Sequence, residues 1–449
     1  MSKIFHNRGD PLWLLSHLQL TRRTFLKSTC LLAGLGSTYL VGCSGSTNSG
    51  GKNAGLPVRV VPRGLGVNVH FGNGSDTIRD IEKLAGLGFH FVRLDLLWNV
   101  VEQKKGHYDF SSYECLISAL SAHSIRSLCI LDYNNSLYEN SLSPPSTVVG
   151  IHTDETRQAF GLFAAAAAAK FRGRGIIWEI WNEPDFPRFW QPKPNPDDYM
   201  ALAKVTISAM RQADPNATIV APALTGIEPK NQEAWNYLER CFMLGLPEFV
   251  DAISVHPYRL GPPESATADY QRLRTLIVRY APKGKANLPI ISSEWGYSLK
   301  KVSQKQQAAY FVRLFLINLL NNLPLSIWYD WRDDGADPKQ IEQNFGILTW
   351  DGQPKIVYFA TQTLTRELAG FRLVKQLPLA SDSDYALLFT NGTACKQVVW
   401  TTNNPHLMAL PAQGTSVLVT DMIGAKYTLP ITNGKVELEL TDNPQYLSL

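Results

Sequence analysis

The stretch that decides the fold is Ile176-Ile177-Trp178-Glu179-Ile180-Trp181, which leads directly into Asn182-Glu183-Pro184-Asp185. Its first six residues form a nearly continuous apolar run, which is typical of a parallel strand that is buried on both faces. In a barrel, the residue that ends such a strand faces the mouth where active sites lie. The sequence therefore predicts a buried strand with polar side chains at its carboxyl end.

Similar apolar runs occur at Gly64–His70, His90–Leu96, Ser127–Asp132, Thr218–Ala223, Asp251–His256, Pro289–Glu294 and Leu325–Asp330. Helical patterns lie between them, among them Thr77–Leu87, Glu155–Arg172, Pro196–Ala213, Ala266–Arg279 and Ser303–Asn321. Eight strand–helix units predict an α/β fold, a (β/α)8 TIM barrel. A doubly wound open sheet is the alternative, but no Gly-rich phosphate turn follows the first run.

The pattern changes from about Phe371, where helical periodicity gives way to short alternating runs separated by Asn-Gly and other Gly-containing turns. These runs are Tyr385–Thr390, Lys396–Thr401, Thr415–Thr420 and Lys435–Leu440. They predict a small C-terminal antiparallel β domain of sandwich-like form, to which Pro57–Val61 is expected to add a strand. The predicted divisions are a leader (1–42), a tether (43–56), a barrel (57–369) and this β domain (370–449).

The formal net charge of +4 belongs to the N-terminal segment. Residues 1–42 hold five of the 43 basic residues and one of the 39 acidic residues, so the remainder has equal numbers of both. A neutral body gives no support for a nucleic-acid partner. No later segment is long and apolar enough to span a membrane, since Arg313 and Asn318 interrupt Phe311–Leu320.

The N-terminal segment has the features of an export signal. Thr21-Arg22-Arg23-Thr24-Phe25-Leu26-Lys27 resembles the twin-arginine signature, and a mildly apolar stretch follows it. This stretch ends in Leu40-Val41-Gly42-Cys43, which looks like a bacterial lipobox, and a Gly/Ser-rich tether comes next. We expect export and lipidation of Cys43, with anchoring in the periplasm or outer membrane; a plain secretory leader is the alternative.

The other cysteines are Cys115, Cys129, Cys241 and Cys395. They stand singly in helix or strand patterns and lack the spacing of a metal site. Buried free thiols fit these positions better than a disulfide pair.

Glu183 is the first candidate for chemistry, because it stands in Ile180-Trp181-Asn182-Glu183-Pro184-Asp185 at the end of the fourth run. The apolar Trp181 face disfavours an ionised carboxylate, and Asn182 is suited to bind a sugar hydroxyl. This combination suits a carboxyl group that must stay protonated beside a sugar. The structural alternative is a glutamate that caps the loop after the strand.

Glu294 is the second candidate, in Ile291-Ser292-Ser293-Glu294-Trp295-Gly296 at the end of the seventh run. A barrel can bring the ends of strands four and seven together across its mouth. Retaining glycoside hydrolysis needs two carboxyl groups about 5–5.5 Å apart, one to protonate the leaving oxygen and one to attack the anomeric carbon. Without its partner, Glu294 would be interpreted as an ordinary surface residue.

These motifs resemble those of glycoside hydrolase clan A, whose members carry the acid/base after an Asn on strand four and the nucleophile on strand seven. The resemblance covers Gly64–Ala369 and implies Asn182 with Glu183 as the strand-four pair and Glu294 as the nucleophile. Phe91–Trp98 and Gly106-His107-Tyr108-Asp109-Phe110 look like the W…E…G-x-Y-D-F stretch of such enzymes. Within the clan, the chain is most similar to family 39 and to exopolysaccharide-associated hydrolases, although family 5 shares these motifs.

Further residues at strand ends are candidates for substrate binding: Arg93, His256, Tyr258, Asn68, His70 and Trp328. Arg93 is placed to hold the nucleophile ionised, or else forms a structural salt bridge. His256 and Tyr258 are expected to contact Glu294 or the sugar. Asn68 and His70 are either readers of sugar hydroxyls or structural residues, and Trp328 is expected to stack on a sugar, whereas Trp331 fits barrel packing better.

The sequence thus predicts a glycosidase that hydrolyses β-glycosidic bonds of a poly- or oligosaccharide by double displacement and needs neither cofactor nor metal. A non-catalytic, polysaccharide-binding envelope lipoprotein is the alternative, although the presence of both glutamates argues against it. A third interpretation keeps the catalysis but places it in exopolysaccharide production. Endo or exo action and the oligomeric state stay open.

Overall fold

The computed structural model describes residues 55–71, 75–139 and 148–449. The predicted leader (1–42), Cys43 and most of the predicted tether (43–56) lie outside these described residues. Within the described ranges, no helix has both the length and the apolar character needed to cross a membrane.

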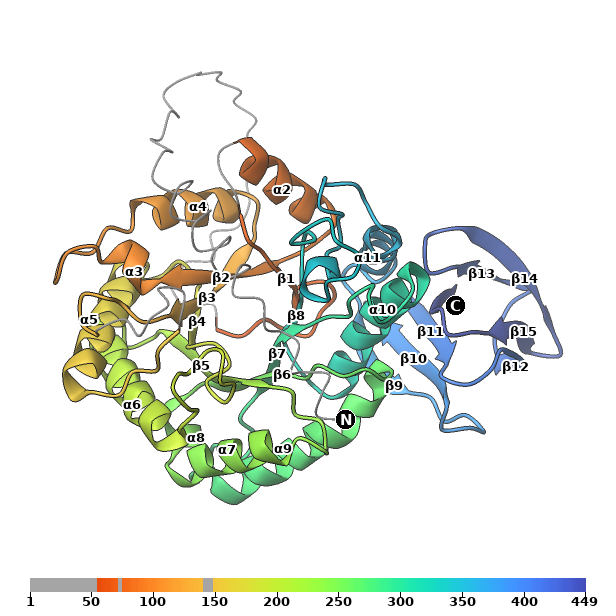
Figure 1. Ribbon diagram of the computed structural model, residues 1–449. Helices are drawn as coiled ribbons and strands as arrows, with labels where there is room; N and C mark the ends of the chain where they lie inside the picture. The colour runs from red at the N-terminus through yellow and green to blue at the C-terminus, as the bar shows by residue number, and fades with distance from the viewer. Residues whose placement is uncertain (1–54, 72–74, 140–147) are drawn as a thin grey trace.

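A closed barrel of eight parallel strands forms the centre of the molecule (Figure 1). The strands are β1 (Leu65–Asn68), β2 (Phe91–Leu97), β3 (Arg126–Asp132), β4 (Ile177–Ile180), β5 (Thr218–Thr225), β6 (Ala252–His256), β7 (Ile290–Trp295) and β8 (Ser326–Trp328). Each pairs with its neighbour in chain order, and β1 closes the barrel by pairing with β8. All eight predicted strands and the TIM-barrel fold are confirmed.

Side chains point alternately to the inside and the outside of the barrel along each strand, and they form two separate apolar cores. In β2, Phe91 points into the barrel, where it packs with Leu128, Ile130 and Ile177, whereas Val92 packs on the outside under the helices. The interior is filled with branched and aromatic side chains, as in other barrels of this size. These apolar side chains fill the barrel interior near the amino-terminal halves of the strands. Polar side chains that point inward therefore gather nearer the carboxyl ends.

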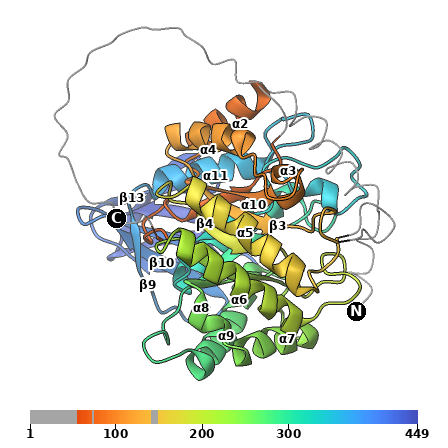
Figure 2. The ribbon, with the colours of Figure 1, turned by 90° about the vertical axis from the view of Figure 1, so that its left-hand side faces the viewer.

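Helices surround the barrel (Figure 1). They are α2 (Ser75–Gly86), α3 (Trp98–Val101), α4 (Ser111–Ala122), α5 (Asp154–Lys170), α6 (Pro196–Ala213), α7 (Gln232–Met243), α8 (Leu246–Phe249), α9 (Ala266–Tyr280), α10 (Gln304–Leu320) and α11 (Ile356–Glu367), with 3-10 turns η2 (Pro263–Ser265) and η3 (Glu342–Asn344). Figure 2 shows α5 and α6 side by side.

The starts of α5 and α6 follow from local sequence. Thr153 caps α5 by accepting a hydrogen bond from the Thr156 amide, and Asn195 does the same for α6, with Pro196 at its first turn. The alanine run of α5 buries Ala164, Ala167 and Ala168, whose small side chains allow helices to pack closely.

The C-terminal residues form one antiparallel sheet of eight strands in the order β12-β15-β14-β13-β16-β11-β10-β9. Their bounds are β9 (Arg372–Gln376), β10 (Asp384–Thr390), β11 (Cys395–Thr401), β12 (His406–Pro411), β13 (Ser416–Thr420), β14 (Lys426–Thr432), β15 (Lys435–Leu440) and β16 (Gln445–Ser448). One apolar core joins Val399 of β11 to Val436 of β15, so the sheet folds back on itself. The predicted antiparallel sheet is confirmed, and it lies beside α10 and α11 (Figure 1).

The prediction that Pro57–Val61 adds a strand to the C-terminal sheet is wrong, because this segment forms bends and a turn. Val61 still exchanges backbone hydrogen bonds with the start of the sheet: its amide donates to Phe371 O at 2.8 Å, and its carbonyl accepts from Gly370 N at 2.9 Å. Pro57 and Pro62 lack the amide protons that a ladder requires, which explains why no strand extends from this contact.

The cysteine prediction holds for two of the four residues. Cys129 on β3 and Cys241 on α7 are buried free thiols, and burial raises the pKa of both thiols. Cys115 and Cys395 are exposed instead.

A buried ion pair joins the barrel to the C-terminal sheet. Arg313 of α10 contacts Glu264 of η2 at 2.7 Å, and both side chains are at most 6% exposed. Trp400 of β11 donates its indole N–H to the same carboxylate at 2.8 Å. Arg313 also donates to the Asp442 carbonyl at 3.3 Å. Glu264 therefore accepts hydrogen bonds from both parts of the chain.

Replacing Arg313→Met should lower the free energy of unfolding by about 3–5 kcal/mol, because it leaves the Glu264 carboxylate buried without its charge partner. Urea denaturation followed by tryptophan fluorescence measures this loss. Arg79→Met is the matched control, since Arg79 pairs with Asp76 at 3.5 Å on the surface, with both side chains more than two-thirds exposed, and its loss should stay below about 0.5 kcal/mol. Equal losses in both variants would contradict the assignment.

Candidate active site

The two candidate glutamates lie at the carboxyl ends of β4 and β7, at one mouth of the barrel. Glu183 follows β4, is 2% exposed, and has a left-handed backbone with φ of 46°. Such a conformation is unusual for a residue with a side chain, and it is often found at functional sites. The Glu183 amide donates to Ala223 O at 3.1 Å, so the neighbouring strand β5 supports this turn.

The separation of the carboxyl groups decides what chemistry is open to them. One carboxylate oxygen of Glu183, one of Glu294 and a ring nitrogen of His256 all lie within 4.8 Å of one another. Retaining glycosidases hold their carboxyl groups about 5–5.5 Å apart, whereas inverting enzymes need about 6.5–9.5 Å to admit a water. The observed separation matches the retaining geometry.

Glu294 reaches this position through an irregularity in β7. Ile291 faces the barrel interior, and strict alternation would place Ser293 there and turn Glu294 outward. The pairing of β7 with β8 shifts register between Ser292 and Trp295, and Glu294 faces the mouth. Gly296 then follows without a side chain, because a Cβ there would lie 1.9 Å from the Tyr329 carbonyl oxygen.

Arg93 of β2 holds the centre of the site. It is 1% exposed, and it donates to Glu294 Oε2 at 2.6 Å and to Glu179 Oε2 at 2.8 Å. It also donates to the side-chain oxygens of Asn182 (2.8 Å) and Asn68 (3.2 Å). Burial opposes the charge, but the carboxylates of Glu179 and Glu294 outweigh it and raise the pKa of Arg93. Both interpretations of Arg93 therefore apply: it contacts the candidate nucleophile and forms a structural ion pair.

His256 and Tyr258 connect to different glutamates. The Tyr258 hydroxyl donates to Glu294 Oε1 at 2.7 Å, while His256 Nδ1 lies 3.0 Å from Glu183 Oε1. Arg93 approaches His256 Nε2 at 3.4 Å. Since a guanidinium can only donate, Nε2 is the acceptor and Nδ1 carries the proton, which it donates to Glu183. His256 thus fixes one oxygen of Glu183, whereas Tyr258 and Arg93 fix both oxygens of Glu294.

Asn68 and His70 lie at the end of β1 in different environments. Asn68 is 3% exposed and its oxygen is occupied by Arg93, so it supports that side chain. Its amide nitrogen lies 3.3 Å from His70 Nε2. His70 is exposed at the mouth, where a ligand can reach it.

The structure corrects the predictions for the tryptophans. Trp328 is 1% exposed and its ring packs against Phe311 of α10, at 5.1 Å between centroids, so it cannot stack on a sugar. Its neighbour Ile327 points into the barrel, and alternation therefore turns Trp328 outward. Trp181 is also fully buried, 5.1 Å from Trp190, and does not present a face at the mouth. Trp331 packs in the core, as predicted.

Glu179 is a residue that the sequence reasoning missed. It is fully buried inside β4 and pairs with Arg93 through one oxygen. A signal was present, because an acid within the apolar run Ile176–Trp181 must find a partner if it is buried. Pairing it with Arg93 from sequence alone would have required the register between strands.

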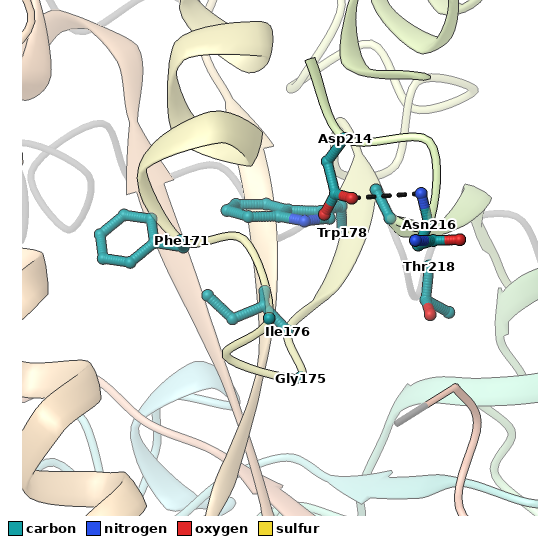
Figure 3. A pocket seen from close by; sticks show the side chains of 9 residues that line it. Phe171, Gly175, Ile176, Trp178, Asp214, Asn216 and Thr218 are labelled. Carbon is teal, nitrogen blue, oxygen red and sulfur yellow. Dashed lines mark hydrogen bonds between the residues drawn. The ribbon is translucent and has the colours of Figure 1, made fainter. Parts of the chain in front are cut away.

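A small hollow lies at the opposite end of the barrel (Figure 3). It is lined by residues just before and at the start of β4 and β5, among them Phe171, Trp178, Asp214 and Thr218. In it, the Asn216 amide donates to Asp214 Oδ1 at 3.1 Å. Because active sites of TIM barrels lie at the carboxyl ends of the strands, this hollow is not the substrate site.

Comparison with known proteins gives a consistent set of relatives. A family model described as cellulase (glycosyl hydrolase family 5) matches residues 53–335. A beta-xylosidase of Geobacillus stearothermophilus is 27% identical over 213 residues, which cover 42% of this chain. The chain spans only 40% of that relative's length.

Solved structures extend the similarity to most of the chain. A family 39 glycoside hydrolase from the gut symbiont Bacteroides cellulosilyticus WH2 has a TM-score of 0.76 and 25% identity, covering 86% of this chain and 81% of that one. A monomeric beta-xylosidase from Caulobacter crescentus CB15 has a TM-score of 0.64 at 17% identity, covering 88% and 97%; at that identity it shows the fold alone. These matches confirm the resemblance to clan A and its family 39-like character.

Asp185 adds a titrating group next to Glu183. Burial raises the pKa of Asp185 to about 7, although its Oδ1 accepts a hydrogen bond from the Thr225 amide at 3.0 Å, which lowers it; the negative charge of Glu183 raises it further. The folded protein therefore binds a proton here more tightly than the unfolded chain does. It follows that this residue reduces the stability of the protein as the pH rises from about 4 through about 7.

An Asp185→Asn variant cannot ionise and keeps an oxygen for Thr225, so its stability relative to wild type should grow with pH across that window. We expect the difference in free energy of unfolding between Asp185→Asn and wild type to increase by about 1–2 kcal/mol from pH 5 to pH 8. This is less than the raised pKa of Asp185 alone would give, because solvent screens its partly exposed carboxylate. Urea denaturation at both pH values measures it. A difference that does not change with pH would contradict the raised pKa.

Proposed function

The chain belongs to the cellulase family (glycosyl hydrolase family 5), and on that basis we propose that it is a retaining glycoside hydrolase acting on β-glycosidic bonds of poly- or oligosaccharides. Glu183 is the acid/base and Glu294 is the nucleophile. The observation that carries this proposal is the separation of at most 4.8 Å between oxygens of the two carboxyl groups.

In the first step, Glu294 attacks the anomeric carbon and the bond to the leaving oxygen breaks. That oxygen takes the proton of Glu183, so the products of this step are a covalent glycosyl-enzyme and an ionised Glu183. His256 donates to Oε1 of Glu183, and we place the transferable proton on Oε2. The same donor then stabilises the carboxylate that forms.

In the second step, Glu183 removes a proton from water, and the oxygen of that water attacks the anomeric carbon. The bond to Glu294 breaks and the carboxylate is restored, with retention of the anomeric configuration. Arg93 and Tyr258 each donate to one oxygen of Glu294. They orient the carboxylate for attack and stabilise its negative charge when it leaves.

The relatives guide the choice of substrate. Beta-xylosidase is the name of the curated relative and of a structural neighbour, and other neighbours are a GH30 endoxylanase from Clostridium papyrosolvens C71 and a GH30 subfamily 8 xylanase from Clostridium acetobutylicum. We therefore take β-linked xylosides as the first substrates to test.

We further propose that the protein acts outside the cytoplasm on an envelope or extracellular polymer, including exopolysaccharide. The twin-arginine-like signature, the lipobox-like Leu40-Val41-Gly42-Cys43 and the neutral body of the chain support this location. A lipid on Cys43 would tether the enzyme to the membrane through that anchor alone.

Glu294→Gln should reduce kcat at least about 10⁴-fold, because the neutral amide cannot form the glycosyl-enzyme. Glu183→Gln should lose about 10²–10⁴-fold in kcat/KM on sugar leaving groups and much less in kcat/KM on dinitrophenyl glycosides, whose leaving group needs no proton. Release of reducing sugar or dinitrophenol measures both. Glu233→Gln, an exposed residue of α7, serves as the isosteric control and should keep wild-type rates.

Proton NMR of the first product formed distinguishes the mechanism. Retention of the β-configuration is expected, and an inverted product would refute double displacement. Tight oligosaccharide binding without cleavage, by wild type and Glu294→Gln alike, would instead favour a non-catalytic binding protein.

Cys43→Ser should move the protein from the membrane fraction to the soluble extracytoplasmic fraction, because the residue that would carry the lipid is removed. Fractionation and immunoblotting of a bacterial host that expresses the full chain measure this. A double Arg22→Lys, Arg23→Lys variant should accumulate in the cytoplasm. Wild type found in the soluble fraction to the same extent as Cys43→Ser would contradict lipidation.

A further inference from the structure

A second group of potential ligands lies at the barrel mouth, between the ends of β1 and β8. It consists of His70 after β1 and of Asp330 and Asp334 after β8. One nitrogen or oxygen from each of the three lies within 4.8 Å of the other two. None of these residues has a role in the proposed hydrolysis, although the cluster is close enough for Glu294 to affect Asp330 electrostatically.

Asp330 is the residue that calls for an explanation. It is 1% exposed, and neither of its carboxylate oxygens has a hydrogen-bond partner. A buried carboxylate without partners is costly, so it must be neutralised by a proton or by a cation. The charge of Lys355 acts on Asp330 and lowers its pKa, but the hydrogen bond of Lys355 goes to Asp333 at 2.6 Å, so the Asp330 oxygens stay without a donor.

The other two ligands are held in place as metal ligands usually are. The Tyr329 hydroxyl donates to Asp334 Oδ2 at 3.2 Å, and its ring packs edge-on against His70 at 6.0 Å between centroids. Outer contacts of this kind fix the orientation of ligands and are typical of metal sites.

The backbone around Asp330 is also fixed. Tyr329 N donates to Trp295 O at 3.1 Å, Trp331 N donates to Asn68 O at 3.0 Å, and Ile347 N donates to Asp330 O at 3.0 Å. The strands on both sides thus hold the segment that carries Asp330. A site that is already rigid loses less entropy when it binds a ligand.

We propose that His70, Asp330 and Asp334 bind a divalent metal ion and that Zn²⁺ fits this ligand set best. Imidazole nitrogen with carboxylate oxygen is a combination that zinc accepts, whereas Ca²⁺ and Mg²⁺ prefer oxygen ligands alone. Three protein ligands leave a fourth position for water or a sugar hydroxyl. The exposed His70 gives the ion a path from solvent.

Two other occupants explain the cluster less well. A sugar hydroxyl would have to hydrogen-bond to Asp330, but both oxygens of that carboxylate are buried from solvent. A proton is the stronger competitor, since burial and the charges of Asp334 and Asp333 raise the pKa of Asp330. A shared proton would not require a histidine as a third member.

Calorimetric titration and thermal unfolding of the metal-stripped full chain test the site without any substrate. Wild type should bind one equivalent of Zn²⁺ and gain about 2–5 °C in Tm at a hundredfold excess over Kd. Ca²⁺ and Mg²⁺ should bind at least tenfold more weakly. His70→Ala, on the exposed ligand, should weaken Zn²⁺ binding at least tenfold, and Asp330→Asn should do the same.

Asp351→Asn, an exposed acid on the segment after β8, is the control and should bind as wild type does. Glu294→Gln removes only a charge that acts on Asp330, so it should weaken Zn²⁺ binding less than His70→Ala does. An ion held by Glu183, His256 and Glu294 would instead be lost in that variant. The absence of stoichiometric binding by wild type would overturn the proposal in favour of a proton on Asp330. Equal affinity in wild type, His70→Ala and Asp330→Asn would overturn it as well.

Discussion

The site depends on one buried guanidinium. Arg93 extends from β2 and makes hydrogen bonds to residues of β1, β4 and β7 and to Asn182 in the turn after β4. It also approaches His256 on β6. A charge in this position is tolerated only because Glu179 and Glu294 compensate it, and removing one partner of a buried pair typically costs about 3–5 kcal/mol. The same interaction therefore stabilises the barrel mouth and orients Glu294, the proposed nucleophile.

Much of this could be predicted from sequence, because buried parallel strands have a direct signature. The order of apolar residues along the chain predicts all eight barrel strands. Trp-Asn-Glu-Pro at the end of one of these runs identifies Glu183 as a candidate. What sequence could not provide was the direction of side chains. The register shift in β7 turns Glu294 inward, and undisturbed alternation turns Trp328 outward. Both depend on pairing between strands, which single-strand patterns do not contain.

The C-terminal sheet was harder to predict in detail. Four of its eight strands were recognised, whereas β9, β12, β14 and β16 were not. β9 is largely exposed and lacks an apolar alternation, whereas in β14 Pro430 interrupts the alternation of Tyr427, Leu429 and Ile431. Glu264 was not recognised either, because its partners Arg313 and Trp400 lie 49 and 136 residues away in the chain. Interactions between domains leave little trace in local sequence.

The span of the Arg93 contacts has a consequence for how the protein folds. Its partners extend from Asn68 to Glu294, and β1 meets β8 only after residue 326 has been made. Contacts this distant in sequence form slowly, since the loop entropy must be lost before they contribute. Partly folded chains therefore have no assembled catalytic centre, and the onset of turnover during refolding would report the closure of the barrel itself.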